Sequence, residues 1–271
     1  MVVDGAQNNN DYPNWDMTIV DNGSEKDETA AYLAKITKDT RIKVLRDDGP
    51  FNFSRLNNRA VAATDGEIIG LINNDIEPIS QDWLSEMVRQ VIQPGVGAVG
   101  AKLYYPNDTL QHGGVIVGLG GVAGHFDKRL PREKLGYFGR AVVVQNFSAV
   151  TAACMLLPRP VFEEVDGLDE VHLAVAFNDV DLCLKIRQAG YRLVWTPYAE
   201  LYHHESVSRG LDSAPEKIDR FAAEIRTMQE RWNTKFEADP FYNPNLTLDY
   251  ERPIISDPPR TTRPWEEFFD A

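Results

Sequence analysis

The sequence is poor in cysteine and in positive charge, and each shortage excludes a class of protein. Its 271 residues include two cysteines, Cys154 and Cys183, both inside apolar segments. Such cysteines are more often buried thiols than halves of a disulfide, which predicts a reducing compartment. The formal net charge of −13 argues against binding to nucleic acid or to an anionic membrane surface, because both require basic patches.

Long apolar runs and several catalytic motifs are also missing. No run of about 18 apolar residues occurs, so we expect no membrane span. Residues 1–5 lack the basic segment and long apolar core of a signal peptide. The chain contains no P-loop, dinucleotide fingerprint, zinc-like cysteine spacing or nucleophile elbow. Hydrophobic content of 43% and charged content of 25% are typical of a soluble globular protein.

Strand-like and helix-like segments alternate along the chain. We expect strands at 17–20, 42–45, in the run that ends at Asp75, and at 96–100, 141–144, 151–157 and 191–195; we expect helices at 25–37, 52–63, 81–92, from 160, and at 178–189 and 213–232. This alternation predicts an α/β domain whose mostly parallel sheet has helices on both faces. The glycine-rich stretch 111–124 is expected to form irregular hairpins or a mobile flap. We divide the chain into a domain of residues 1–234 and a proline- and aromatic-rich strap of residues 235–271.

The first candidate site lies where an isoleucine-rich run ends. Residues 66–72 are largely apolar, and Asn73-Asn74-Asp75 follows them, with Pro78 soon after. The pattern predicts a buried strand whose carboxyl end presents Asp75 to a cleft, where open α/β sheets bind ligands. One carboxylate with oxygen-bearing neighbours suits a divalent cation that grips phosphates. The alternative is that Asp75 caps a turn, in which Asn73 and Asn74 are equally common.

A second acidic cluster opens the helix predicted at 178–189. We expect Asn178 to be the N-cap and Asp181 to be its capping partner. Asp179 then points elsewhere, and the helix amino terminus favours its ionised form. An ionised carboxylate at a cleft is a candidate general base for a sugar hydroxyl. The alternative is that Asp179 only stabilises the helix dipole.

Two adjacent histidines follow the last predicted strand, in the segment 202–206. Neighbouring residues of an extended segment face opposite sides, so at most one of His203 and His204 readily joins a given site. That histidine could bind a metal or a phosphate, or it could be a hydrogen-bonded structural residue. Asp21, after the strand at 17–20, could accept a hydrogen bond from a base or ribose, or cap its own turn.

Taken together, these segments resemble a family-2 glycosyltransferase of the GT-A fold. They are most similar to bacterial enzymes that add sugars to O-antigen or rhamnan-type surface polysaccharides. The resemblance extends from about Tyr12 to Leu248 and rests on six motifs in the expected order, at residues 12–24, 73–75, 150–154, 178–184, 201–206 and 239–246. Each motif alone is weak, but six in register are specific.

The resemblance implies an inverting, metal-dependent transfer of a hexosyl or deoxyhexosyl group. The donor would be a nucleotide-sugar, and the acceptor a hydroxyl of a growing surface polysaccharide or glycolipid, such as a lipid-linked oligosaccharide. It implies Asp179 as catalytic base, and Asp75 with His204, or as second choice His203, at a Mn²⁺ or Mg²⁺ ion. Residues implied at the nucleotide and donor site are Asp21, Asn52, Asn73, Asn74 and Thr151. The implied location is the bacterial cytoplasm, with peripheral attachment at the inner membrane face as the alternative.

The chain departs from the family pattern at two points. Its metal motif has one carboxylate, Asp75, where many relatives carry two. Only residues 1–11 precede Tyr12, so we expect the family's first strand to be missing or truncated. Residues 1–3 are then a candidate remnant strand, and a partner domain or chain would complete the site.

Two other functions stay open at this point. The short amino terminus favours a catalytically inactive GT-A module that binds glycan or scaffolds a larger polysaccharide synthase. A nucleotidyltransferase would fit the sheet and the metal, but the chain lacks a glycine-rich, basic phosphate loop near the first strand. A metal ion favours the transferase, because it would offset repulsion between a chain of net charge −13 and an anionic donor.

Overall fold

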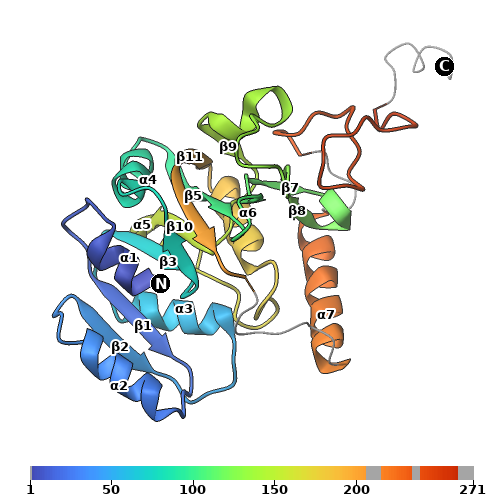
Figure 1. Cartoon of the computed structure of the whole chain (residues 1–271). Coiled ribbons are helices and arrows are strands. Elements are labelled where there is room, and N and C mark those ends of the chain that lie inside the picture. The colour runs from blue at the N-terminus through green and yellow to red at the C-terminus, as the bar shows by residue number, and fades with distance from the viewer. Residues whose placement is uncertain (1, 206–214, 234–238, 262–271) are drawn as a thin grey trace, which may run out of the picture.

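Helices and strands alternate through residues 2–205, 215–233 and 239–261, which the computed structural model describes (Figure 1). The helices are α1 Val2–Asn8, α2 Asp27–Ile36, α3 Phe53–Ala62, α4 Trp83–Val91, α5 Arg159–Glu164, α6 Asn178–Gln188 and α7 Pro215–Trp232, with 3-10 helices η1 Leu119–Gly121 and η2 Tyr137–Val142. The strands are β1 Met17–Asp21, β2 Ile42–Arg46, β3 Ile68–Ile72, β4 Ile76–Pro78, β5 Val96–Tyr104, β6 Leu110–His112, β7 Val115–Val117, β8 Ala123–His125, β9 Gln145–Phe147, β10 Cys154–Pro158 and β11 Arg192–His203. The expected α/β class is confirmed, but the central sheet is mixed rather than mostly parallel: β11 is parallel to β5, whereas the pairings of β10 with β3 and β5, of β4 and β9 with β11, and of β6 with β5 are antiparallel. Within the described ranges, no helix is both long and apolar enough to cross a membrane.

A seven-stranded sheet forms the centre of the fold. Its order is β3-β10-β5-β11-β4, with β6 paired to β5 and β9 to β11, while β1–β2 and β7–β8 form separate two-stranded sheets. Strand β10 is antiparallel to both β3 and β5, and β11 is parallel to β5, so β3, β5 and β11 run in one direction. The carboxyl ends of β3 and β11 therefore lie at the same edge as the amino end of β10. This edge carries the candidate site.

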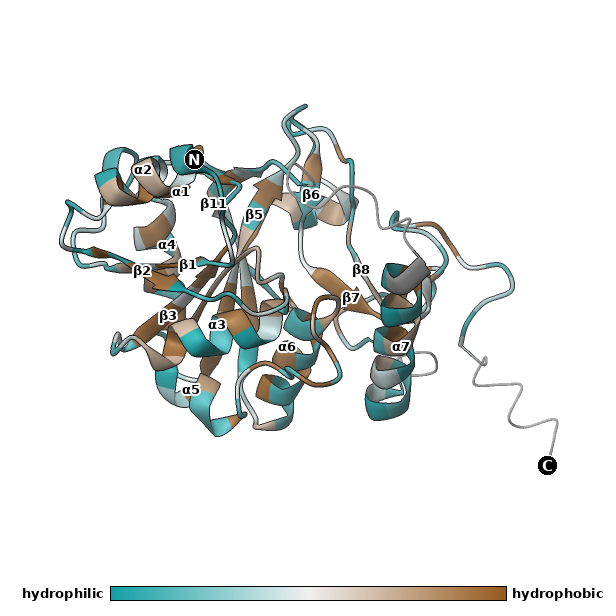
Figure 2. Cartoon of the chain, turned by 90° about the horizontal axis from the view of Figure 1, so that it is seen from below, coloured by the Kyte–Doolittle hydropathy of each residue, from teal (hydrophilic) through white to brown (hydrophobic). Residues whose placement is uncertain are grey.

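Helices cover both faces of the sheet, α4 on one and α3, α5 and α6 on the other (Figure 2). The alternation of β5 explains the two layers, because successive strand residues face opposite sides. Val99 and Leu103 pack in one cluster with Trp83 of α4. Ala98 belongs to the other cluster, which includes residues of α5 and α6 and Trp195 of β11. Both cysteines are free and buried, as the sequence predicts.

The residues before β1 form a helix rather than a strand, so the prediction of a remnant strand at 1–3 is wrong for the residues described; Met1 lies outside them. Val3 and Ala6, three residues apart, are both buried, which is the spacing of one helical face. Val3 packs with Ile36 and Ile42. The side chain of Asn9 then donates to the carbonyl of Pro78 at 2.8 Å. The amino-terminal segment is thereby held against β4.

The glycine-rich stretch 111–124 forms hairpins, which confirms the first of the two predicted structures, hairpins or a mobile flap. Strand β6 pairs with β5, and β7 pairs with β8. The strand predicted at 141–144 is wrong, because η2 occupies residues 137–142 and the strand is β9, which pairs with β11. Burial decides the difference: Val143 is 48% exposed, whereas Phe147 is fully buried and packs edge-to-face on Trp195.

The carboxyl-terminal helix α7 and residues 239–261 pack on the same hairpin region and on the core. Met228 of α7 is fully buried. In the strap, an oxygen of Asp239 accepts from the N–H of Val117 at 2.8 Å, and the carbonyl of Leu248 accepts from Gly120 at 2.8 Å. The predicted helix start at 213–214 and strap residues 235–238 and 262–271 lie outside the described residues.

Alanine substitutions at two glycines of this region, Gly114 and Gly120, test how the hairpins pack. Gly114 has φ +98°, and a β-carbon there would lie 2.4 Å from the Phe147 ring, whereas at Gly120 (φ +64°) it would meet nothing within 4 Å. Both alanine variants suffer left-handed backbone strain, but only Gly114→Ala also forces a buried ring to move. We expect Gly114→Ala to lower the free energy of unfolding by about 1–3 kcal/mol more than Gly120→Ala. Urea unfolding of both variants measures this, and equal losses would contradict the packing.

Candidate active site

Asp75 lies in the turn that ends β3. The N–H of Asn73 donates to the carbonyl of Ala153 at 2.9 Å, and that of Ile76 to the carbonyl of Asn73 at 3.4 Å. These bonds join the end of β3 to the segment before β10 and close the turn. Asp75 is largely buried, with a side chain 13% exposed, whereas Asn74 is exposed.

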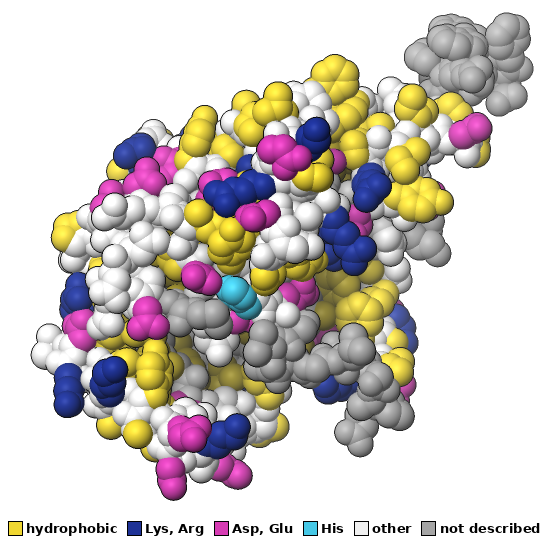
Figure 3. All heavy atoms as spheres, in the orientation of Figure 1, with side chains coloured by type: hydrophobic (Ala, Val, Ile, Leu, Met, Phe, Trp, Pro, Cys, Tyr) yellow, Lys and Arg dark blue, Asp and Glu magenta, His cyan; other side chains and the backbone are white. Residues whose placement is uncertain are grey.

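The two histidines at the end of β11 face opposite ways, as the sequence predicts. His203 Nε2 lies 3.2 Å from Asp75 Oδ1 and 3.3 Å from Asn73 Nδ2. Its Nδ1 lies 2.7 Å from Oε1 of Gln111. His204 instead places Nε2 2.8 Å from Oε2 of Glu77. The structure thus puts the second-choice histidine beside Asp75 and the first-choice histidine beside Glu77. In the space-filling view of Figure 3, a histidine side chain lies next to acidic side chains near the middle of the surface shown.

The Asp75–His203 pair offers two metal-ligating side chains. Among the described residues, no group of three or more histidine, cysteine or acidic side chains is placed to hold a metal ion. Mg²⁺ sites on nucleotides commonly use one or two carboxylates, with substrate phosphates and water as the other ligands. A carboxylate with an adjacent imidazole fits a divalent ion of that kind.

Asp179 lies in the first turn of α6, at the same edge of the sheet. Its Oδ2 accepts from the N–H of Ala152 at 3.1 Å, and its Oδ1 from that of Val180 at 2.9 Å. Burial raises the pKa of the Asp179 carboxyl, and hydrogen bonds from Ala152, from the Thr151 side chain and from Val180 act in the opposite direction. A carboxylate with a raised pKa is a stronger base than an ordinary aspartate.

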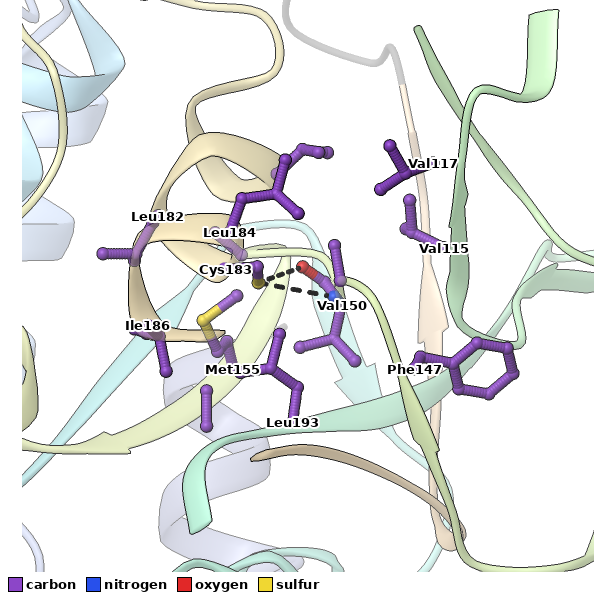
Figure 4. Packing of buried hydrophobic residues seen from close by; sticks show 14 of the residues in the cluster. Val115, Val117, Phe147, Val150, Met155, Leu182, Cys183, Leu184, Ile186 and Leu193 are labelled. Atoms are coloured by element: carbon purple, nitrogen blue, oxygen red, sulfur yellow. Dashed lines mark hydrogen bonds between the residues drawn. The ribbon is translucent and has the colours of Figure 1, made fainter. Parts of the chain in front are cut away.

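The segment that holds Asp179 is anchored in the core beneath it. Figure 4 shows Val150 facing Cys183 of α6, with both its N–H and its carbonyl hydrogen-bonded to the thiol at 3.5 Å. Burial is the main reason that the pKa of the Cys183 thiol is raised, so the group stays protonated and acts as a structural donor. Thr151 follows directly, and its hydroxyl accepts from the N–H of Ala153 at 3.3 Å.

Helix α7 holds the amino terminus of α6 from outside. Asp181 is fully buried and does not cap α6, so the predicted capping pair with Asn178 is wrong. Instead its Oδ1 accepts from Arg231 Nη1 and from the Trp232 indole, both at 2.8 Å. A buried carboxylate needs such partners, and α7 supplies them in tertiary contact. The N-cap is Phe177, with φ 59°, and its ring stacks on Phe221 of α7 at 5.6 Å.

The expected nucleotide residues Asp21 and Asn52 lie around a second loop, between β2 and α3. Asp21 Oδ2 accepts from Arg46 at 2.6 Å. Burial opposes ionisation of Asp21, but hydrogen bonds from Ser24 and Arg46 outweigh it and lower its pKa. Asn52 is the N-cap of α3, accepting from the N–H of Arg55 at 2.9 Å, and its amide donates to the carbonyl of Glu170 at 2.8 Å.

Three residues of the site region escaped the sequence reasoning. Gln111 contacts His203, and His112 and His125 contact each other. All three lie in the glycine-rich stretch and its continuation, where we expected hairpins without assigning chemistry. A polar residue at a buried strand position was the available signal, since such groups need specific partners.

With this geometry established, comparison with known proteins identifies the family. The family model described as Glycosyl transferase family 2 matches residues 2–165. The chain therefore belongs to glycosyl transferase family 2.

Two curated relatives match most of this chain. It is 54% identical over 248 residues to the uncharacterized protein y4gI of Sinorhizobium fredii, covering 91% of this chain and 27% of that protein. It is 40% identical over 248 residues to the O-antigen biosynthesis protein RfbC of Myxococcus xanthus, covering 91% of this chain and 19% of that protein. The chain thus spans about a quarter or less of these relatives' length.

Solved structures show the same fold. A mannosyltransferase from Pyrobaculum calidifontis in complex with GDP-Man and Mn²⁺ matches with a TM-score of 0.57 at 18% identity, covering 83% of this chain and 60% of that one. GalNAc-T7 with UDP, GalNAc and Mn²⁺ matches with a TM-score of 0.60 at 14% identity, covering 78% and 41%. At these identities the likeness shows the GT-A fold.

The contact between α6 and α7 leads to a prediction about the free energy of unfolding. Asp181→Ala removes the acceptor of the Trp232 indole and one of the two carboxylates that contact Arg231, which keeps Asp169. Because Arg231 is 32% exposed, we expect a loss of about 2–4 kcal/mol in the free energy of unfolding, below the cost of breaking a fully buried pair. Chemical denaturation measures it. Asp219→Ala, an exposed residue of α7, is the control and should change stability by no more than about 0.5 kcal/mol. Equal effects would show that Asp181 does not anchor α7.

Proposed function

We propose that this chain transfers a sugar, with inversion and with a divalent metal, from a nucleotide-sugar donor to a hydroxyl of a growing surface polysaccharide or glycolipid. One observation carries the proposal: Asp179 and the Asp75–His203 pair lie at the same edge of the central sheet, linked through residues 152–153. The bonds in that link run from Asn73 to Ala153 and from Ala152 to Asp179. A base and a diphosphate site are the two parts that such a displacement requires.

In the proposed reaction Asp179 accepts the proton of the acceptor hydroxyl. The hydroxyl oxygen forms a bond to the anomeric carbon of the donor, and the bond from that carbon to the phosphate oxygen breaks. A single displacement of this kind inverts the configuration. The N–H groups of Ala152 and Val180 orient the carboxylate, and its raised pKa favours proton uptake.

The Asp75 carboxylate and the His203 imidazole would hold a Mn²⁺ or Mg²⁺ ion on the donor diphosphate, with His204 as a further candidate. When bound, such an ion supplies charge stabilisation of the departing nucleoside diphosphate. The side chains of Asp21, Asn52, Asn73 and Asn74 are the proposed nucleotide contacts. Thr151 is the proposed contact to the donor sugar, and its side-chain hydrogen bond to Asp179 supports that proposal.

A second candidate is a catalytically inactive module that binds glycan or scaffolds a larger synthase. The separation of β1–β2 from the seven-stranded sheet is the observation that favours it, because the nucleotide side of the proposed site then lacks continuous sheet support.

Nucleotide binding separates these two functions. In calorimetric titrations of UDP, GDP and dTDP with Mn²⁺, the transferase proposal expects metal-dependent binding of at least one. Omitting Mn²⁺ should abolish or strongly weaken that binding. Failure of all three to bind a folded chain would favour the scaffold function.

Asp179→Asn tests the base. The amide keeps the shape but cannot take a proton, so we expect transfer to fall by about 10²–10⁴-fold with nucleotide affinity nearly unchanged. Asp166→Asn, at an exposed acidic residue, should leave both unchanged. In the wild type, turnover should fall as the pH drops through the raised pKa of Asp179, because protonation removes the base. Loss of nucleotide binding in a folded Asp179→Asn variant would assign the residue to binding instead.

Asp75→Ala tests the metal site. Removing the carboxylate should weaken Mn²⁺-dependent nucleotide binding by about tenfold or more, while any metal-independent binding persists. Glu77→Ala is the matched control, since Glu77 is also acidic and contacts the other histidine, His204. Titration calorimetry on both variants distinguishes the two positions. Unchanged metal-dependent affinity in Asp75→Ala, or a larger loss in Glu77→Ala, would move the metal away from Asp75.

A further inference from the structure

Two histidines outside the proposed chemistry contact each other beside the active-site segment. His112 of β6 and His125 of β8 place their Nδ1 atoms 2.9 Å apart, with rings perpendicular and centroids 5.1 Å apart. His112 is fully buried. Such a pair must share one proton between the facing nitrogens, because a hydrogen bond needs one donor and one acceptor.

A backbone contact assigns that proton. The N–H of Thr151 can only donate, and it donates to His112 Nε2 at 3.4 Å. His112 Nε2 is therefore the acceptor, so the neutral ring carries its proton on Nδ1 and donates it to His125 Nδ1. His125 then carries its proton on Nε2. The proton positions are assigned from the Thr151 N–H donor and from the contact between the two Nδ1 atoms.

The surroundings keep both rings neutral. Burial lowers the pKa of His112 well below its usual value and that of His125 to about 4, and the charges of nearby groups add to both effects. A second proton on His125 would place two N–H groups face to face at the shared Nδ1 contact, and a second proton on His112 would place an N–H at Nε2 against the Thr151 N–H. The pair therefore persists as a neutral, directional chain that ends at Thr151.

That chain reaches the proposed base through consecutive backbone groups. Thr151 N–H bonds to His112, and the next N–H, that of Ala152, bonds to Asp179. The Thr151 side chain also hydrogen-bonds to Asp179. We propose that His112, oriented by His125, is a positioning residue that holds the 150–153 segment so that Asp179 points at the acceptor hydroxyl. This inference rests on the proposed transferase function.

Loss of the His112 acceptor should change the geometry of the 150–153 segment rather than the affinity for nucleotide. Without an acceptor at His112, the Thr151 N–H loses its partner, and the segment can turn toward another acceptor. A displacement of about 1 Å at a reacting group can cost 10²-fold in rate. His112 belongs to β6, and its hydrogen bond to the site comes from the Thr151 backbone N–H rather than from a side chain proposed to bind the nucleotide, so its loss should act on turnover.

Three variants test the proposal in the full chain. His112→Leu removes both nitrogens, and His112→Gln restores an acceptor near the Nε2 position. His172→Leu removes an exposed histidine as a control. Turnover is measured with Mn²⁺ as release of the nucleoside diphosphate from the nucleotide-sugar that carries the nucleotide found to bind. We expect kcat to fall about 10–100-fold in the leucine variant, to recover at least partly in the glutamine variant, and to stay unchanged in the control. Nucleotide Kd should change by less than about twofold.

Spectroscopy keeps the test decisive where a variant is unstable or the donor is not turned over. In the wild type, ¹⁵N spectra should show His112 as the neutral Nδ1–H tautomer. In the variants, the carboxyl titration of Asp179 should move upward in His112→Leu and return in His112→Gln, because the Ala152 and Thr151 bonds that lower its pKa loosen and re-form. An Nε2–H tautomer at His112, or unchanged kcat and unchanged Asp179 titration in a folded His112→Leu, overturns the inference. Absence of nucleotide binding by the wild type overturns the proposed function instead.

Discussion

The candidate site depends on the hydrogen bonding of one short backbone segment, residues 150–153. Its successive polar groups bond to separate parts of the fold: Thr151 N–H to β6, Ala152 N–H to α6 and the Ala153 carbonyl to the end of β3. Backbone groups that leave water must find partners, so the segment cannot move toward one element without losing its bond to another. Asp179, which is the proposed base, the turn that carries Asp75 and the histidine pair are therefore positioned together.

Tertiary contacts also maintain a backbone conformation that local preference opposes. Phe177, two residues before Asp179, has φ 59°, which costs a bulky residue about 1–3 kcal/mol. The stacking of Phe221 on its ring and the bonds of Arg231 and Trp232 to Asp181 supply compensating interactions from α7. The direction in which α6 presents its first turn is thus decided by a helix about 50 residues further along the chain.

Arginine side chains near Asp21 are paired with carboxylates of the chain itself. This pairing explains why a chain of net charge −13 would need a metal ion to bind a diphosphate. At the end of β2, Arg46 pairs with Asp21 and Asp48. Arg55 and Arg59 of α3 both pair with Asp47. These guanidinium groups neutralise carboxylates of the chain itself. Because these arginines are paired with carboxylates, a divalent ion at Asp75 would supply the positive charge that a diphosphate requires.

Local sequence patterns predicted the α/β class, a strand leading into the turn of Asp75 and the start of α6 at Asn178, because each follows from an apolar run, a turn or a helix start; the strand, β3, ends at Ile72. Alternation also predicted that His203 and His204 face opposite ways. Which of the two meets Asp75 depends on strand pairing, because the pairing of His203 with Ile76 follows a register shift within β11. The partners of Asp181, and the contact of His112 with His125, likewise depend on elements that pack together from distant positions. Local periodicity carries no information about such packing.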